Sequence, residues 1–322
     1  MERQPIKTYL DFEKSIAELE SKVAELNALV SNDPSVSISD EVEQLQQKAS
    51  EALVTTYAGL TPWQKTQVAR HPDRPHTLDF VAGMTADFTP LAGDRYYSED
   101  AAVVGGPAFF RGQRVMVIGN EKGSDTEGRL KHNFGMARPE GYRKAVRLMD
   151  MAERFKLPVI TFVDTAGAYP GVGAEERGQA EAIARSTDRS LSLTVPMITV
   201  VVGEGGSGGA VAIASANDVL MLEHAIYTVA SPEAAASILW RDSSRAIDAA
   251  TGMKITAQDL LELGVIDQII SEPIGGAHRD RAAMIGATAD AIATCLDRYT
   301  GMDGHAIRRQ RQNRFLEIGR SL

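Results

Sequence analysis

The stretch from Met197 to Ala214, MITVVVGEGGSGGAVAIA, constrains the fold more than any other part of the chain. It begins with β-branched residues typical of a buried strand, continues with five glycines between Gly203 and Gly209, and ends with small apolar residues that suit a buried helix. Dense glycines leave backbone N–H groups uncovered, and the first N–H groups of a helix lack intrahelical partners. Because the helix dipole adds positive potential there, the stretch predicts a strand–turn–helix unit that binds an anion or oxyanion.

A dinucleotide-binding motif also matches this stretch. The spacing from Gly203 to Gly208 fits the G-x-G-x-x-G fingerprint, with Glu223 at a tolerable distance for a contact to a ribose. The fingerprint normally follows the first strand of a series of βαβ units that is dedicated to the nucleotide. Here the glycines lie well into the second half of the chain, and no clear series of such units accompanies them. This interpretation is therefore weaker than that of an oxyanion site.

The same glycines surround Ser207 in the pattern G-x-S-x-G, the nucleophile elbow of serine hydrolases. Such an enzyme needs an acid and then a histidine further along the chain, and Asp267 and His278 are an available pair. A structural alternative needs no ligand, because glycines also allow a strand and a helix to pack closely. An oxyanion site, a hydrolase elbow and close packing thus remain open on the glycines alone.

Composition and charge restrict the class of protein. The 322 residues are enough for one large domain or two, and a net charge of -9 argues against general nucleic-acid binding. The one cysteine, Cys295, excludes a disulfide framework and a cysteine-based zinc site, and it is compatible with a reducing cytoplasm. No signal peptide is recognisable, and the glycines and Glu204 make the apolar segment 196–216 unsuited to spanning a membrane. We therefore expect a cytoplasmic protein that binds neither nucleic acid nor membranes.

Residues 1–58 predict a helical hairpin, and residues 59–322 predict a larger domain. In the hairpin, apolar residues recur alternately four and three positions apart, which is the seam of a coiled-coil helix. A break at Asn32–Ser35 separates two helices, and the boundary to the larger domain falls between Tyr57 and Thr77. A short hairpin is marginal alone, so it packs either on a partner chain or on its own domain. The seam residues are Phe12, Ile16, Leu19, Val23, Leu26 and Val30, followed by Ile38, Val42, Leu45, Ala49 and Ala52.

Histidine and basic side chains outside the glycine stretch give weaker signals. His71 and His76 lie in a turn-rich segment where no carboxylate or third histidine has the spacing of metal ligands. We interpret both as surface loop residues. Arg143, Lys144 and Arg147 lie in a segment with helical periodicity, and we interpret them as a solvated helix face, with a phosphate contact as the alternative.

The remaining segments alternate between strands and helices, which predicts an α/β domain. The loops after Asp164 and Val202 follow strands of successive units, so we expect them to line one cleft. No G-x-x-x-x-G-K-[ST] occurs, which excludes nucleotide hydrolysis of the P-loop type. Neither loop supplies a base beside a nucleophile, whereas the glycines expose many backbone N–H donors. Such a site is suited to stabilising a delocalised oxyanion, for example an enolate or a ureido anion. The expected strands are 103–110, 114–119, 159–164, 197–202, 219–222 and 226–229, and the expected helices are 139–156, one from about 175, and two that begin after N-caps at Ser231 and Thr256.

A series of further motifs occurs along the chain, and they include Gly93-Asp-Arg95, Val104-Gly-Gly106, Asn133-Phe-Gly-Met136, Pro139-Glu-Gly-Tyr-Arg-Lys-Ala145, Asp164-Thr-Ala-Gly-Ala-Tyr-Pro-Gly171, Gly203-Glu-Gly-Gly-Ser-Gly-Gly-Ala210, Ser231-Pro-Glu233, Ser237-Ile-Leu-Trp240 and Gly275-Gly-Ala-His278. In this order, these segments closely resemble the carboxyltransferase α subunit of bacterial acetyl-CoA carboxylase. The resemblance covers nearly the whole chain. Ala166 and Ala234 stand where the family often has proline and glycine, and position 234 tolerates alanine because it lies in the first turn of a helix.

The resemblance implies a crotonase-like fold, a spiral of ββα units, preceded by the helical hairpin. It also implies transfer of a carboxyl group from carboxybiotin to acetyl-CoA, giving malonyl-CoA for fatty-acid synthesis. The implied partners are a β subunit with a four-cysteine zinc ribbon and most of the acyl-CoA site, the biotin carboxyl carrier protein, and biotin carboxylase. The resemblance also implies an α2β2 assembly, in which the β subunit binds zinc and this chain binds no metal.

The resemblance places the biotin ureido oxygen on the peptide N–H groups of Gly208 and Gly209. As carboxybiotin loses CO2, negative charge grows on that oxygen, and fixed N–H donors at a helix start stabilise it. The ureido nitrogen then takes the proton from the acetyl methyl group, so no protein base is required. This agrees with the absence of a recognisable base in the sequence. Further residues expected to contact the biotin are Gly205, Gly206, Ser207, Gly167, Ala168 and Tyr169.

Overall fold

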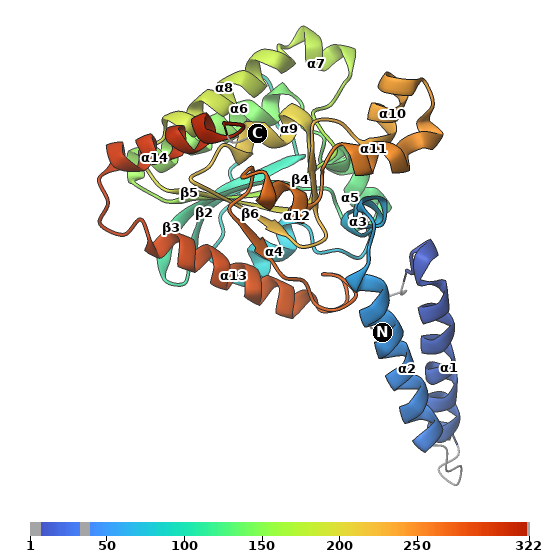
Figure 1. Cartoon of the computed structure of the whole chain (residues 1–322). Helices are drawn as coiled ribbons and strands as arrows, with labels where there is room; N and C mark the ends of the chain where they lie inside the picture. Colours follow the sequence, from blue (N-terminus) through green and yellow to red (C-terminus); the bar gives the residue numbers. More distant parts are fainter. Residues whose placement is uncertain (1–7, 33–38, 321–322) are drawn as a thin grey trace.

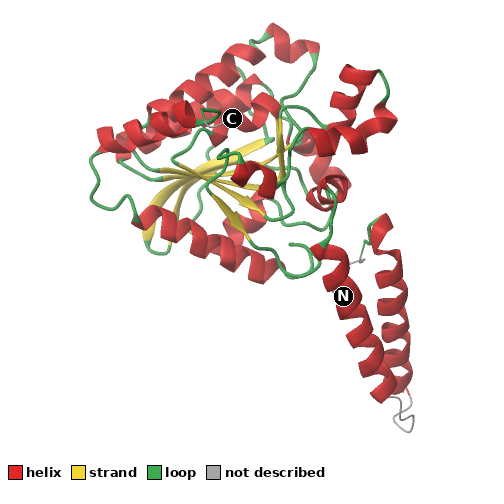
Figure 2. Cartoon of the chain, viewed as in Figure 1, coloured by secondary structure: helices red, strands yellow, loops and turns green. Residues whose placement is uncertain are grey.

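The computed structural model describes residues 8–32 and 39–320. One sheet of eight strands forms its centre, in the order β1-β2-β3-β4-β5-β6-β8, with β7 paired to the end of β5. Figure 2 shows these strands as a fan between helices. The strands are β1 (Thr85–Ala86), β2 (Val103–Phe110), β3 (Gln113–Asn120), β4 (Val159–Thr165), β5 (Met197–Gly206), β6 (Asp218–Leu222), β7 (Ile226–Thr228) and β8 (Gln268–Ile270).

Helices cover both faces of this sheet. The α-helices of the described residues are α1 (Lys14–Asn32), α2 (Ser39–Ala58), α3 (Pro62–Ala69), α4 (Thr77–Met84), α5 (Thr126–Lys131), α6 (Pro139–Phe155), α7 (Val172–Glu176), α8 (Gln179–Ser192), α9 (Ser207–Ala214), α10 (Pro232–Trp240), α11 (Ala246–Gly252), α12 (Ala257–Glu262), α13 (Arg281–Asp297) and α14 (Gly304–Glu317). Figure 1 shows α6, α8, α9 and α14 on one side of the sheet and α4 and α13 on the other. Within the described ranges, no helix is long and apolar enough to cross a bilayer.

The hairpin of β2 and β3 confirms the two strands and tight turn that the sequence predicts. Its register runs from Val103 opposite Asn120 to Phe110 opposite Gln113. Arg111 and Gly112 form the turn with φ angles of 49° and 81°, and a two-residue loop with two positive φ angles is a type I′ turn. The pairs from β3 through β4, β5 and β6 to β8 are parallel. Because helices cover both faces, β4 and β5 are buried along their whole length.

The interpretation of the basic residues of α6 as a solvated face is wrong for two of them. Lys144 is buried, and its Nζ donates to the carbonyl oxygen of Asp100 at 2.8 Å. Arg143 is mostly buried and its Nε donates to Asp94 Oδ2 at 2.8 Å. The physical reason is that the chain between β1 and β2 returns across α6, so these cations hold a loop in place.

The first two helices form the predicted hairpin, which extends away from the body of the protein in Figure 1. Its base is attached to the main body by Arg279, which donates to Glu20 Oε1 at 2.7 Å and to Glu13 Oε1 at 3.3 Å. Ile16 is fully buried in an apolar cluster at the same level. The base therefore docks on its own domain, while the division into domains 1–58 and 59–322 stays a prediction. The predicted break at 33–35, position 38, and the side chain of Val30 lie outside the described residues.

His71 and His76 are buried, so their interpretation as surface loop residues is wrong. The ring of His71 stacks on that of His278 with centroids 3.7 Å apart, and its Nε2 lies 2.8 Å from the carbonyl oxygen of Thr8. Nδ1 of His76 lies 2.7 Å from Oδ2 of Asp164. The turn-rich segment is covered because it passes between the hairpin and the sheet. Among the described residues, no group of three or more His, Cys, Asp or Glu is arranged to hold a metal ion.

A buried ion pair joins this segment to β5. Arg74 donates to both carboxylate oxygens of Glu272, at 2.8 and 2.5 Å, and its Nε donates to the carbonyl oxygen of Val202 at 2.7 Å. Glu272 also accepts the backbone N–H groups of His224 and Ala277. Both side chains are almost fully buried, so each charge depends on these partners.

We expect Glu272 to make folding stability depend on pH. Burial alone raises its pKa, but the Arg74 guanidinium outweighs burial and lowers the pKa of Glu272 from 4.5 to about 2. A lowered folded pKa adds stability that is fully present above the unfolded value and is lost as pH falls through the folded value. The free energy of unfolding should therefore fall between pH 4.5 and 2 more steeply in the natural chain than in Glu272→Gln. Denaturant titrations at several pH values check this, and equal slopes contradict it.

Candidate active site

The strand–turn–helix unit predicted from the glycine stretch is present. β5 ends at Gly206, and α9 begins at Ser207 with no side chain that caps its N-terminus. Because the first N–H groups of a helix lack intrahelical partners, those of Gly208 and Gly209 have none within α9. Ser207 has a φ of 55°, which is uncommon for a residue with a Cβ and marks local strain. The turn therefore presents an uncapped helix N-terminus with positive potential.

The loop after β4 packs directly on this turn, so the two loops meet as expected, but no residue of the loop after β4 lines the cavity beside Gly208. A Cβ added to Gly206 would lie 2.2 Å from the carbonyl oxygen of Ala166. A Cβ on Gly209 would lie 2.7 Å from the carbonyl carbon of Gly167 and 2.8 Å from the nitrogen of Ala168. All three distances are shorter than real Cβ atoms show. Close backbone packing, the structural alternative from the sequence, therefore accounts for glycine at positions 206 and 209.

Gly208 is different, because it borders a cavity. A Cβ at this position would meet only the side chain of Ile183, whose Cγ2 would lie at 3.3 Å. Ser207 and Gly208 line a cavity of about 440 Å³ between α9, β7 and α12. Its walls are mainly apolar, and the other lining residues are Val211, Tyr227, Thr228, Val229, Met253, Lys254, Leu260, Leu263 and Val265. The uncapped end of α9 thus lies beside an apolar cavity large enough for part of a small organic molecule.

The other predicted binding residues pack around the turn and do not line this cavity. Gly205 pairs with Thr165 in the β4–β5 register and lies against the ring of Tyr227. Gly167 is buried with a φ of 147°, a value that favours glycine. Tyr169 donates its N–H to the carbonyl oxygen of Ala137 at 2.9 Å. Of the eight predicted site residues, the structure therefore brings Ser207 and Gly208 to the cavity and places the others in the packing around them.

A buried charge cluster lies under the glycine turn, and the sequence did not reveal it. Lys122 Nζ lies 2.9 Å from Asp164 Oδ1 and 2.6 Å from Glu204 Oε2. Asp164 Oδ1 also accepts the backbone N–H of Glu204 at 3.1 Å, and its Oδ2 contacts His76. Burial alone raises the pKa of Asp164 and of Glu204, but Lys122 outweighs burial and lowers both. Both carboxylates are therefore ionised, and their positions fix β4 and β5 relative to one another.

The cluster continues to α10 through Arg70. Its Nε donates to Glu204 Oε1 at 2.6 Å, and another of its nitrogens donates to Glu233 Oε1 at 2.6 Å. Glu233 lies in the first turn of α10, where Ser231 is the N-cap and accepts the N–H of Ala234 at 3.1 Å, as predicted. Ala234 has no positive φ, so alanine suits this position. Glu204 therefore binds Lys122 directly and is linked to α10 through Arg70.

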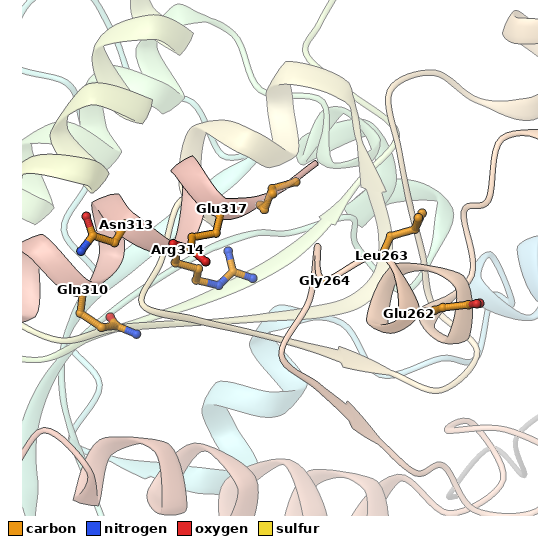
Figure 3. A pocket seen from close by; sticks show the side chains of 8 residues that line it. Glu262, Leu263, Gly264, Gln310, Asn313, Arg314 and Glu317 are labelled. Atoms are coloured by element: carbon orange, nitrogen blue, oxygen red, sulfur yellow. The ribbon is translucent and has the colours of Figure 1, made fainter. Parts of the chain in front are cut away.

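A second cavity of about 440 Å³ lies between α12 and α14. Figure 3 shows Gln310, Asn313, Arg314 and Glu317 on one side of it and Glu262, Leu263 and Gly264 on the other. Arg314 is already engaged, since it donates to Asp267 Oδ2 at 2.9 Å and to the carbonyl oxygen of Val265 at 2.7 Å. None of the predicted site residues lines this cavity, so it adds nothing to the candidate active site.

The residues proposed for a serine hydrolase do not form a triad with Ser207. Asp267 accepts hydrogen bonds from Arg314 and from the backbone N–H of Val219. His278 stacks on His71, and burial together with that neighbour lowers the pKa of His278 to about 3, which makes it a weak base. Among the described residues, no hydrogen bond joins Ser207 to a histidine. The glycine turn therefore has donors for an oxyanion but no activated nucleophile.

The fold is that of the crotonase-like carboxyltransferases, as expected from the motifs. Transcarboxylase 12S, solved with methylmalonyl-coenzyme A bound, aligns with a TM-score of 0.58 and 20% identity over 70% of this chain and 42% of that chain. A Pseudomonas malonate decarboxylase hetero-tetramer in complex with coenzyme A aligns with a TM-score of 0.59 and 17% identity over 74% of this chain and 94% of that chain. At these identities, the likeness establishes the fold alone.

Sequence similarity over nearly the whole chain establishes the family. Residues 9–319 match the family described as acetyl co-enzyme A carboxylase carboxyltransferase-like. The acetyl-coenzyme A carboxylase carboxyl transferase subunit alpha of Xanthobacter autotrophicus is 65% identical over 317 residues, which are 98% of this chain and 100% of the relative. The subunit of the same name from Azorhizobium caulinodans is 66% identical over 317 residues, with the same coverage. The chain belongs to this family, which confirms the resemblance.

Proposed function

We propose that this chain is the α subunit of the carboxyltransferase of acetyl-CoA carboxylase and that it transfers a carboxyl group from carboxybiotin to acetyl-CoA, forming malonyl-CoA for fatty-acid synthesis. Family membership supports the reaction class. The structural observation that carries the proposal is the uncapped N-terminus of α9, where Gly208 borders an apolar cavity. This arrangement suits a ligand with an apolar body and one oxygen that becomes negatively charged.

The residues present fit the head group of biotin. Its ureido oxygen needs hydrogen-bond donors, and the N–H groups of Gly208 and Gly209 lie in the first turn of α9 without a side-chain cap. Its fused rings need an apolar surface, which Val211, Met253 and Leu263 supply. The absence of a Cβ at position 208 leaves only Ile183 as a close neighbour, so a planar group has access to the amide.

Carboxybiotin, when bound, supplies the carboxyl group and gathers negative charge on its ureido oxygen as that group leaves. The chain's contribution is to hold N–H donors and the dipole of α9 where this charge develops. The apolar wall excludes water and so strengthens the hydrogen bonds. The carboxylates nearest to the turn, Asp164 and Glu204, are both bound to Lys122. Neither is free to act as a base, so the chain stabilises charge and leaves proton transfer to groups outside it.

The proposal includes a partner subunit. The relatives are named as α subunits, which implies a complex of several chains. In this proposal, a zinc-ribbon β subunit supplies the acyl-CoA site. The biotin carboxyl carrier protein delivers the cofactor, and biotin carboxylase carboxylates the biotin beforehand. An α2β2 arrangement in the cytoplasm completes the proposal.

The test is reconstitution. The chain is co-purified with the zinc-ribbon β subunit, and malonyl-CoA formation from carboxybiotin and acetyl-CoA is measured. We expect activity in the complex and none in either subunit alone, because this chain has charge-stabilising donors but no acyl-CoA site of its own in the proposal. A stable complex without activity, or full activity of this chain alone, contradicts the proposal.

A serine hydrolase that uses Ser207 is the rival function. A fluorophosphonate probe labels activated serines, so we expect Ser207 to stay unlabelled because no histidine is hydrogen-bonded to it among the described residues. Mass spectrometry of the treated chain, with a known serine hydrolase as the positive control, measures the labelling. Stoichiometric labelling of Ser207 favours the rival function.

A further inference from the structure

The loop that crosses α6 presents two exposed tyrosines in a fixed arrangement. Asp94 Oδ1 accepts the backbone N–H groups of Tyr96, Tyr97 and Ser98 at 3.0, 2.8 and 3.1 Å, so the loop is rigid although it has no regular secondary structure. Tyr96 is 84% exposed and Tyr97 is 64% exposed. Large exposed rings on a rigid loop lose little entropy on binding, and tyrosine is enriched where proteins bind one another.

Two arginines support these rings. The guanidinium of Arg143 lies 5.1 Å from the ring centroid of Tyr96, and that of Arg177 lies 4.6 Å from the ring centroid of Tyr97. Both arginines also bind Glu140, at 2.9 and 2.7 Å. Their charges are therefore compensated within the chain, and their role is to fix the tyrosines.

Two further arginines beside the tyrosines have no carboxylate partner among the described residues. Arg147 donates to the carbonyl oxygens of Leu91, Ala92 and Gly93, at 3.0 to 3.2 Å. Arg95 donates to the same carbonyl oxygen of Ala92 at 3.0 Å. Burial and the nearby Arg95 lower the pKa of Arg147 by more than the carboxylates of Glu99 and Asp94 raise it. Two like charges thus lie close together in a chain with a net charge of -9, and an added carboxylate stabilises both.

We propose that Arg95, Tyr96, Tyr97 and Arg147, here named the Arg–Tyr face, form the docking surface for an acidic segment of the protein that carries the biotin. This inference rests on the proposed function. Charge complementarity favours an acidic partner surface, and the combination of tyrosine with arginine is typical of residues that dominate binding energy.

The position of the Arg–Tyr face suits a carrier that delivers its cofactor to the glycine turn. Glu140, which holds Arg143 and Arg177, lies in the first turn of α6. The N-cap of the same helix, Arg138, places its guanidinium 4.7 Å from the ring centroid of Tyr169. Tyr169 belongs to the loop that packs on the turn. A protein docked on this face therefore lies next to the loops of the candidate active site.

The experiment separates docking from catalysis by using two forms of the same substrate. The complex of this chain with its β subunit is prepared with Arg95→Glu and with Tyr96→Ala. Binding of the biotinylated carrier protein to the immobilised complex is measured directly. KM is then measured in the reverse of the proposed reaction, in which the biotinylated carrier or free biotin accepts the carboxyl group of malonyl-CoA and acetyl-CoA is released. Arg154→Glu is the matched control, because Arg154 is an exposed arginine at the far end of α6 without a carboxylate partner among the described residues.

We expect Arg95→Glu and Tyr96→Ala each to weaken carrier binding and raise the KM for the carrier by about tenfold, which is the size of effect found for important interface residues. The KM and kcat for free biotin should not change, and Arg154→Glu should behave like the natural chain. Salt should weaken carrier binding less in Arg95→Glu than in the natural chain, since an attraction has been removed. Unchanged carrier binding in both variants, or equal impairment with carrier and free biotin, overturns the inference. If the natural complex transfers no carboxyl group with either the carrier or free biotin, the result contradicts the proposed function instead.

Discussion

Replacement of Gly208 by valine is expected to lower carboxyl transfer by about 10²–10³-fold, the cost of losing an oxyanion donor, while the subunit stays folded. The only close neighbour of the added Cβ is the flexible side chain of Ile183, so the fold accommodates the first carbon. The two further methyl groups lie beside the cavity and cover the N–H group that the ligand needs. The measurement is kcat for malonyl-CoA formation by the complex with the β subunit.

Two other variants show whether this effect is local. Gly286→Val in α13 is the control, because no atom lies within 4 Å of an added Cβ there, and it should keep full activity. Gly208→Ala should fall between the natural chain and Gly208→Val, since a single methyl group covers less of the amide. Full activity of Gly208→Val in an intact complex rules out the role of this amide.

Replacement of Lys122 by methionine is expected to destabilise the fold by about 3–5 kcal/mol, the usual effect of removing one partner from a buried ion pair. It leaves Asp164 and Glu204, two buried carboxylates that share Lys122, without the cation between them. Arg70 still neutralises Glu204, so the main cost falls on Asp164. Denaturant unfolding at neutral pH measures the loss. Because protonation relieves a buried unpaired carboxylate, the difference from the natural chain should shrink as pH falls.

The double variant Lys122→Met with Asp164→Asn tests the stated cause. It removes the unpaired charge, so it should recover part of the lost free energy of unfolding. Lys131→Met replaces an exposed lysine and should change stability by no more than about 0.5 kcal/mol. If Lys122→Met is as mild as this control, the cluster does not have the energetic role assigned to it.

The parts of the fold that local chemistry determines could be predicted from the sequence. β5 and α9 follow from β-branched residues, glycines and small apolar residues in succession. The turn at Arg111-Gly112 and the N-caps at Ser231 and Thr256 depend on neighbouring residues alone. The short helix α5 is an exception: it lies in a segment for which we expected neither a strand nor a helix, and the side chain of Asp125 caps its N-terminus.

The long-range contacts could not be predicted. Glu204 within an apolar glycine stretch and Asp164 at the end of an apolar strand both indicate buried acids that need a cation. Nothing in the spacing identifies Lys122 as that cation, since it follows a different strand, β3, which is far from both acids in the sequence. The burial of His71 likewise depends on His278, far along the chain. For the candidate site, the sequence predicted the strand–turn–helix unit but did not separate Gly208, which lines the cavity, from Gly206 and Gly209, which the neighbouring loop requires to be glycine.

At Gly208 the cavity is bordered by main chain, here called its floor. Elsewhere it is bordered by side chains such as those of Val211 and Met253, here called its walls. An inhibitor whose carbonyl oxygen binds the amide of Gly208 engages a group that every amino acid except proline retains. Resistance by substitution would therefore arise in the walls, at residues such as Val211 or Met253, where side chains can change size. Compounds that draw most of their affinity from the floor, and little from the walls, should retain their potency longest.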